Sequence, residues 1–374
     1  MKPNLVAPIA TTLLALGIGN ALAAPVLYEM NLHTYSGMGA GGAMGMVGSL
    51  FGKKGASVSK TMDLRLTNPA DIPDGYAAEH TVPAGMGIGP TLPLKGERRS
   101  GGSGGSQSTG DDPEGRILIY WGCSDTVPKG QPQVIDFKAM GKTMSPEVMA
   151  MVHQARARKG GTPAAEGESL PPRTVWWPMG DSNFRGIPAE ASAVGEHVVK
   201  ASFMPQDINY TLGSGLDFLE PLNLKADGDI KAAVPLNWDG LARVKGYNLN
   251  AVGAAEKEVV IWMAARNKSP MLPASQTRCT IPAGIFEKVQ MAMVVEEGVG
   301  PQGGFAYPPE EPGKPRKPLV WSVRVRVSTS DSVLLGMQQA AGAAAKDAAG
   351  DAAADAVVPG GGAVLKSLKG LFGK

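Results

Sequence analysis

Residues 230–252 read IKAAVPLNWDGLARVKGYNLNAV, two apolar stretches that are separated by turn-forming residues. In the first stretch Leu236 and Trp238 alternate with polar neighbours, so both fall on one face of an extended chain. Alternation with a period of two is typical of a half-buried strand. The stretch therefore predicts strands over residues 230–238 and 244–252.

The same pattern continues on both sides of this stretch. Short apolar segments alternate with Gly, Pro, Asn and Asp, which end strands and form turns. Together they predict seven strands, over residues 222–224, 230–238, 244–252, 258–263, 278–281, 289–295 and 319–328. Seven short strands within about 110 residues are typical of an immunoglobulin-like sandwich.

The two central strands carry a Leu-x-Trp motif, Leu236 to Trp238, followed by Tyr247 nine residues after the tryptophan. In this respect residues 219–330 resemble a fibronectin type III domain, in which such a tryptophan and tyrosine pack in the core. The resemblance implies a β-sandwich that serves as a binding or spacing module, and it implies no catalysis.

The first half of the mature chain, residues 24–215, is predicted to be a second β-rich domain. Its clearest strand is the continuous apolar run Arg116–Cys123, which we expect to be buried on both faces. Residues 95–115 and 155–171 are rich in Gly, Ser and charged residues and are predicted to be flexible, disordered loops. The fold class is therefore mostly β, with two β-rich parts and an Ala/Gly-rich C-terminal tail over residues 337–374.

Residues 1–23 have the features of a cleavable secretory signal peptide. Lys2 precedes an apolar run over Leu5–Leu22, and the run ends in the small-x-small sequence Ala21-Leu22-Ala23. Glycines, an asparagine and Pro8 interrupt the run, which makes a permanent membrane anchor the weaker alternative. We expect cleavage near Ala23 and a periplasmic or secreted protein.

Bulk composition excludes several classes. The 374 residues carry a formal net charge of +2, which is too close to neutral for a nucleic-acid binder. Fifty glycines and 30 prolines interrupt the chain too often for a helical protein. The expected partners are another envelope protein, a glycan or an anionic membrane surface, and no cofactor is expected.

The chain has two cysteines, Cys123 and Cys279. In an oxidising compartment they would form one disulfide that joins the two halves of the protein. Two separately buried thiols are the alternative, since free cysteine is among the most buried residue types. The spacing does not decide between these interpretations.

One enzymatic site is conceivable. Gly180-Asp181-Ser182-Asn183 follows a predicted strand, as the nucleophile does in esterases of the GDS type, and His197 is the one histidine after Ser182. Val194 stands where the aspartate of the family's Asp-x-x-His motif would be. Gly, Asp, Ser and Asn also form simple turns, which is the plainer interpretation. The four histidines are isolated, and none pairs with other ligands at metal-binding spacing.

The tail ends in a short stretch with apolar residues at helical spacing and lysines off that stripe. Leu365, Leu368, Leu371 and Phe372 form the stripe, and Lys366 and Lys369 lie beside it. A basic amphipathic helix of this kind binds an anionic membrane or a partner groove. The alternative is a frayed terminus.

These patterns together predict an exported protein of the cell envelope with a non-enzymatic binding or structural role. The rival hypothesis is a secreted or periplasmic serine hydrolase that uses Ser182. The aromatic pairs Tyr120-Trp121 and Trp176-Trp177 either belong to the core or line a carbohydrate or peptide groove.

Overall fold

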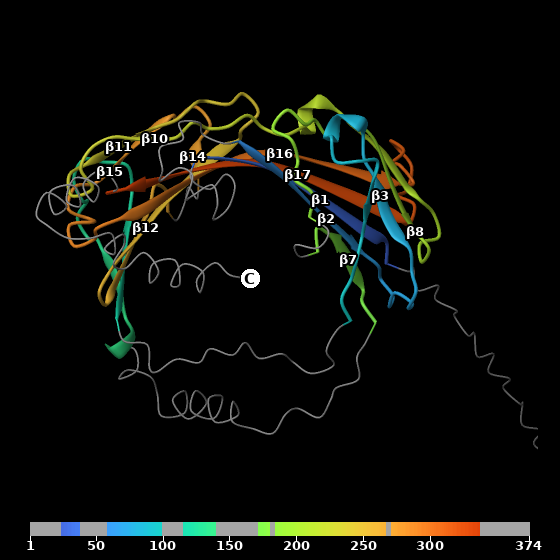
Figure 1. Cartoon of the computed structure of the whole chain (residues 1–374), viewed down its shortest axis with the longest axis horizontal. Helices are drawn as coiled ribbons and strands as arrows, with labels where there is room; N and C mark the ends of the chain where they lie inside the picture. Colours follow the sequence, from blue (N-terminus) through green and yellow to red (C-terminus); the bar gives the residue numbers. More distant parts are fainter. Residues whose placement is uncertain are drawn as a thin grey trace, which may run out of the picture.

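The computed structural model describes residues 24–37, 58–98, 115–139, 171–179, 184–266 and 271–336. These residues form one large, strongly curved sheet that is shaped like an arch, with two smaller sheets on its outer side (Figure 1). The inner, concave side of the arch bears neither small sheet. The protein is mostly β, as the sequence predicts.

The strands vary from two to sixteen residues in length. The large sheet contains β1 (Val26–Gly37), β2 (Ser59–Thr67), β5 (Arg116–Trp121), β6 (Gln133–Asp136), β7 (Thr174–Trp177), β12 (Gly246–Ala255), β13 (Glu258–Met263), β14 (Leu272–Pro273), β16 (Ala292–Tyr307) and β17 (Trp321–Leu335). One small sheet contains β3 (Ala78–Thr81), β4 (Thr91–Pro93), β8 (Gly195–Ala201) and β9 (Ile208–Leu212). The other contains β10 (Lys225–Ala226), β11 (Val234–Asn237) and β15 (Arg278–Ile281).

Strands from both halves of the chain share the large sheet. Its order is β6-β5-β13-β12-β16-β17-β1-β2-β7, with β14 paired to β12. The first strand, β1, runs parallel to the last, β17, along its whole length, and β5 runs parallel to β13. The sequence predicts a domain boundary near residue 215, but the pairing of this sheet crosses that boundary.

Alternating side chains give the large sheet its two faces. Along β1 the apolar residues Val26, Tyr28, Met30 and Leu32 are buried, while the residues between them are half-buried or exposed. Strand β17 alternates in the same way, and its buried residues face the outer sheets. A period of two is what places one set in the core and the other on the concave side.

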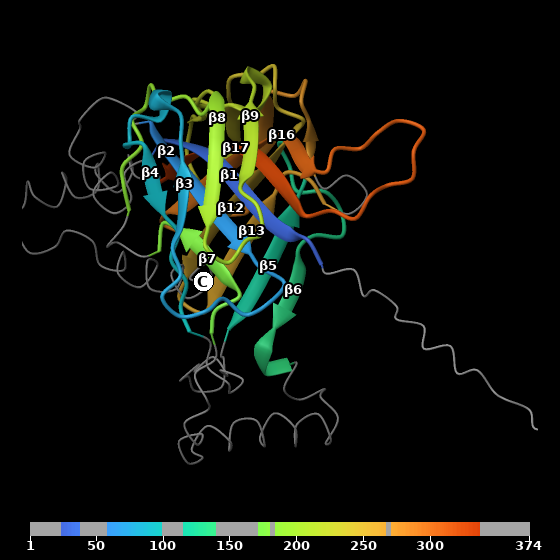
Figure 2. The same cartoon turned by 90° about the vertical axis from the view of Figure 1, so that its right-hand side faces the viewer.

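The four-stranded sheet packs over β1, β2 and β17, as the side view shows (Figure 2). Its buried residues Ile208, Tyr210 and Leu212 alternate along β9. The Tyr210 ring lies 5.0 Å from Phe305 of the large sheet. These contacts form one half of the core.

The three-stranded sheet packs over the other arm of the arch. Leu236 and Trp238 are both buried, and the Trp238 ring meets Tyr247 of β12 edge-on at 5.5 Å. The tryptophan and tyrosine of the fibronectin-like motif therefore pack together. Tyr247 nevertheless belongs to the large sheet, which includes strands from outside residues 219–330, so these residues do not form a separate sandwich.

A segment without strand structure, residues 216–224, connects the two outer sheets across the top of β16. The large sheet has glycines beneath it: a Cβ at Gly303 would lie 2.4 Å from Leu216, and one at Gly300 would lie 2.8 Å from Leu219. Glycine is what permits this close approach of backbone to side chain.

Several predicted strands are confirmed with small shifts, and some expectations are wrong. Residues 222–224 are not a strand, because they belong to the connecting segment. Strands β16 and β17 extend well beyond the predicted 289–295 and 319–328. The run Ile117–Trp121 is half-buried rather than buried on both faces, because β5 lies next to the edge of the sheet.

Other predictions fall on residues outside the described ranges. These are the signal peptide over residues 1–23, most of the loops over 95–115 and 155–171, and the tail over 337–374 with Leu365, Lys366, Leu368, Lys369, Leu371 and Phe372. They stay predictions.

Candidate functional site: the concave face of the large sheet

His197, the proposed base of the hydrolase hypothesis, lies in the core. Its side chain is fully buried, Nε2 lies 2.8 Å from the Ala193 carbonyl oxygen, and Nδ1 lies 3.0 Å from Nε2 of His80. Ser182 is outside the described residues. Because both ring nitrogens of His197 are occupied, a catalytic role would require these hydrogen bonds to break.

His197 belongs to a buried chain of hydrogen bonds in which each group donates to the next in the same direction. The Ala193 carbonyl can only accept, so Nε2 of His197 donates to it and Nδ1 accepts from Nε2 of His80. Nδ1 of His80 then accepts from the Tyr28 hydroxyl at 2.6 Å. Burial lowers the pKa of His80 and of His197, and the neighbouring His197 lowers the pKa of His80 further. Both rings are therefore neutral and act as core residues.

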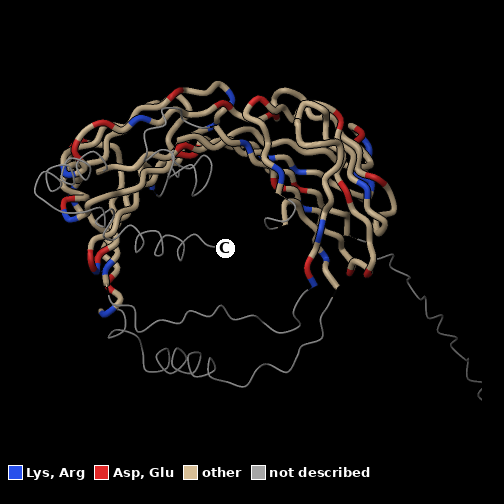
Figure 3. The backbone as a smooth tube through the Cα atoms, viewed as in Figure 1, with Lys and Arg blue, Asp and Glu red and all other residues tan. Residues whose placement is uncertain are grey.

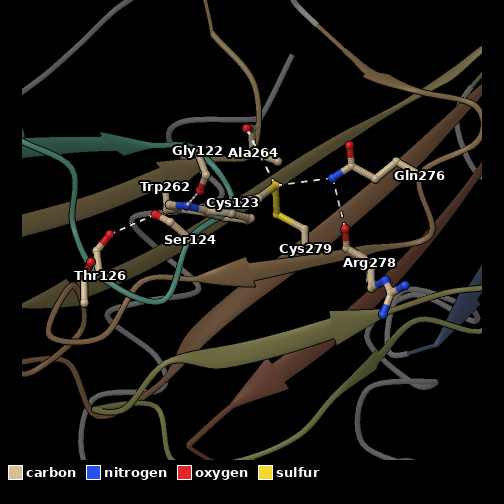
Figure 4. Close-up of a disulfide and its surroundings, with 9 residues drawn as sticks. All are labelled: Gly122, Cys123, Ser124, Thr126, Trp262, Ala264, Gln276, Arg278 and Cys279. Carbon is tan, nitrogen blue, oxygen red and sulfur yellow. Dashed lines mark hydrogen bonds between the residues drawn. A yellow bond between two sulfur atoms is a disulfide. The ribbon is translucent and has the colours of Figure 1, made fainter.

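Cys123 and Cys279 form a disulfide, which resolves the alternative that the sequence leaves open. Cys123 is exposed just after β5, whereas Cys279 is buried in β15. Hydrogen bonds hold residues 122–124 to both sheets. The Gly122 carbonyl accepts from the Trp262 indole N–H at 2.9 Å (Figure 4). The Ser124 N–H donates to the Thr280 carbonyl at 3.1 Å. The disulfide thus joins the segment after β5, the second strand from the edge of the large sheet, to the three-stranded sheet.

The concave face is ordered into rows of side chains that cross the strands. One row crosses five strands, from Gly304 on β16 through Arg324, Glu29 and Arg65 to Trp176 on β7. The next row contains Gln302, Arg326, Asn31 and Asp63. We call Arg65, Arg324 and Arg326 the arginine cluster.

Glu29 is the shared acidic partner of the arginine cluster. Its carboxylate lies 3.2 Å from Arg326, 3.7 Å from Arg324 and 4.0 Å from Arg65. Only the Arg326 contact is a hydrogen bond, and Arg326 also donates to the Asn31 side chain at 3.4 Å. Three guanidinium groups around one carboxylate leave an excess of positive charge, which Asp63 in the adjacent row offsets in part.

Further along the face, His33 lies between two serines of β17. Its Nδ1 is 2.6 Å from the Ser328 hydroxyl and its Nε2 is 2.8 Å from the Ser330 hydroxyl. The Tyr35 ring lies 4.0 Å from the His33 ring. Burial lowers the pKa of His33 to about 4, so this ring is neutral at physiological pH and adds no charge to the face.

The opposite arm of the concave face is apolar. One row there contains Ile119, Ile261, Val252, Met293 and Leu334, contributed by five neighbouring strands. An adjacent row includes Val295, which is 36% exposed, and Trp121, whose ring is covered by Arg266 at 4.2 Å. The concave face therefore changes from charged to apolar along the arch.

A hollow on the outer surface can be compared with this face. It measures about 680 Å³ and lies against the four-stranded sheet, and its lining includes the basic residues Lys95, Arg185 and Lys200 and the acidic residues Glu79 and Asp207. The hollow is open to solvent, and Arg185 already donates to the carbonyls of Ile88 and Thr91. Its mixed charges do not select one kind of ligand.

Neither metal binding nor membrane spanning is indicated within the ranges that the structure describes. No group of three or more His, Cys, Asp or Glu side chains in these ranges could hold a metal ion. No helix in them is long and apolar enough to cross a membrane. Basic and acidic residues are interspersed along the described backbone (Figure 3).

Comparison with known proteins does not show a family. No family model and no curated protein matches the chain. Among solved structures, the Mu homology domain of Fcho1 from Danio rerio with bound Eps15 peptide is similar over 83% of this chain and 98% of that one. The sequence identity is 8% and the TM-score is 0.20, so the likeness carries no argument about function.

The arginine cluster was missed by reasoning from the sequence. The alternation Met62-Asp63-Leu64-Arg65-Leu66 indicates that Arg65 points away from the core. Nothing in the sequence shows that β17, nearly at the other end of the described chain, places Arg324 beside the same glutamate. That information lies in the parallel register of β1 and β17.

Proposed function

We propose that this chain is an exported, non-enzymatic binding or structural protein of the cell envelope, and that the concave face of its large sheet is the binding surface. The observation that carries the proposal is the ordered set of charged, aromatic and apolar rows on that face. Strands hold these side chains rigidly, which reduces the entropy lost when a ligand binds.

Two observations support an exported location. Disulfides persist in oxidising compartments and are rare in the cytosol, and Cys123 and Cys279 are bonded. The sequence of residues 1–23 matches the pattern of a cleavable leader. Cleavage near Ala23 would leave β1, which starts at Val26, intact.

Export is tested by expressing the full chain in a host with a secretory pathway. We expect a periplasmic or secreted product that begins at Ala24 and contains no titratable thiol after denaturation without reductant. A variant with Ala23→Arg should keep its leader, because signal peptidase requires a small residue there. Mass spectrometry of the N-terminus and thiol titration measure both. A cytoplasmic product with Met1 and two free thiols would contradict export.

The role of the concave face is tested with two matched valines. Val295 on the concave face and Val194 on the outer surface are 36% and 39% exposed. We expect Val295→Asp to lower cosedimentation of the purified mature protein with isolated cell envelopes by about tenfold, as for a residue central to an interface. Val194→Asp should leave cosedimentation unchanged. Equal behaviour of the two variants would place the binding surface elsewhere.

A further inference from the structure

We propose that the arginine cluster, together with Trp176, binds the carboxylate groups of an acidic polysaccharide. The inference rests on the proposed role of the concave face and specifies its ligand. Arginine presents a planar fork of N–H donors that matches a carboxylate, so a group of arginines on a solvent-facing surface indicates an anionic ligand.

The guanidinium groups have spare hydrogen-bonding capacity. Side chains of Arg65 and Arg324 are 58% and 61% exposed, and within the described parts of the chain each is only in loose ion-pair contact with Glu29. Arg326 is 38% exposed, and a single nitrogen of its guanidinium group donates to both Glu29 and Asn31. One carboxylate does not satisfy the many N–H donors of three guanidinium groups.

Strand pairing fixes the spacing of the cluster. Arg324 and Arg326 lie on the same face of β17, about 7 Å apart along the strand, since side chains of one face repeat every second residue. Arg65 and Arg324 are separated by β1, which corresponds to about 10 Å across the sheet. A polymer with several carboxylates in line can bring a separate carboxylate to each of several arginines, whereas a single small anion brings only one.

The neighbours of the cluster favour a sugar chain over other anionic partners. Trp176 lies directly across from Arg65 and is half-buried, so its indole can pack against the apolar face of a sugar ring. Gly304 beside Arg324 has no side chain and leaves room next to the guanidinium. A flat membrane cannot follow the inside of an arch, and an acidic peptide has no need of the tryptophan (Figure 1).

Binding of the purified mature protein to polygalacturonate tests the inference, with neutral dextran, galacturonate monomer, polyglutamate and phosphatidylglycerol vesicles as comparisons. We expect polygalacturonate to bind more tightly than each of these, and its affinity to fall with added salt. The double variant Arg65→Gln/Arg324→Gln should weaken that binding at least tenfold. The matched variant Lys231→Gln/Arg278→Gln, which removes two exposed positive charges, one in the turn before β11 and one in β15, should bind like wild type.

Glu29→Gln supplies a test with the opposite sign. Removing the competing carboxylate should strengthen polygalacturonate binding several-fold while leaving the fold intact, whereas a purely structural role of Glu29 would give no gain. Wild-type affinity in the Arg65→Gln/Arg324→Gln variant, or preference for the vesicles or polyglutamate, would overturn the inference. If Val295→Asp still loses envelope binding in that case, the concave face keeps its proposed function with another ligand.

Discussion

Replacing Glu296 with glutamine is expected to stabilise the protein at pH 8 by about 5 kcal/mol. Glu296 points from β16 into the core, with no exposed surface, and within the described residues neither carboxyl oxygen has a hydrogen-bond partner. Burial, followed by the charge of neighbouring Asp331, raises the pKa of Glu296 to about 9. Folding at pH 8 therefore requires this side chain to take up a proton, which glutamine does not.

The direction of the effect follows from the difference between the pKa of Glu296 in the folded protein and in the unfolded chain. Between the ordinary glutamate pKa of 4.5 and about 9 the folded protein holds a proton that the unfolded chain has lost. Wild-type stability should therefore fall by about 1.4 kcal/mol per pH unit across that range. The variant should lack this slope, so the two unfolding curves converge near pH 4. Urea denaturation at several pH values measures the difference, with the exposed Glu287→Gln as a control. Parallel pH profiles would show that Glu296 is ionised in the core.

Asp331 explains why Glu296 is the member of the pair that keeps the proton. The Asp331 carboxylate accepts from the backbone N–H of Leu224 at 3.0 Å and of Ser332 at 2.6 Å. Burial raises the pKa of Asp331, while these donors, Ser36 and the Asn223 N–H lower it. Donors to the charged form concentrate on one carboxylate, so the other is neutral.

Loss of the disulfide is expected to cost about 5 kcal/mol. The bond closes a loop of 156 residues, and the entropy that such a cross-link removes from the unfolded chain grows with loop length. The double variant Cys123→Ala/Cys279→Ala should unfold at a clearly lower urea concentration than the oxidised wild type. Dithiothreitol should lower the wild-type midpoint to a similar degree, because Cys123 is exposed.

A control separates the cross-link from the packing of the side chains. The double variant should itself be insensitive to dithiothreitol, and the reduced wild type should have nearly the same midpoint as the variant. Identical midpoints for oxidised and reduced wild type would show that the unfolded chain is already restricted in this region without the bond.

The sequence supports the prediction of individual strands better than of their pairing. Alternation identifies β1, β2 and β13 because each buries one face, which leaves a period-two pattern in the residues themselves. The two-residue strand β10 and the three-residue strand β4 are too short for such a pattern. The part of β16 after residue 295 was missed because its Gly-Pro-Gln-Gly-Gly stretch resembles a turn, although the strand continues through it with a β-bulge in its pairing to β17.

The candidate site is less predictable because it depends on contacts between distant segments. Trp176 was identified as a candidate ligand-contacting residue, and the structure places it beside Arg65, which sequence reasoning did not single out. His197 was considered as a base, but its environment is set by His80, 117 residues away, and by the ring of Tyr210 stacked on it. A local motif carries no information about such neighbours.

The parallel pairing of β1 with β17 also determines how late in synthesis the large sheet can form. His33 contacts Ser328, 295 residues later, and β17 is the strand through which β1, β2 and β7 join the rest of the large sheet. A chain that emerges from a ribosome or a translocation channel with its N-terminus first leaves β1 without this neighbour until residues near 321 have appeared. Unpaired strand edges favour aggregation, and such distant pairing slows folding. Folding of this chain is therefore expected to depend on keeping its early strands apart from other chains until β17 has emerged.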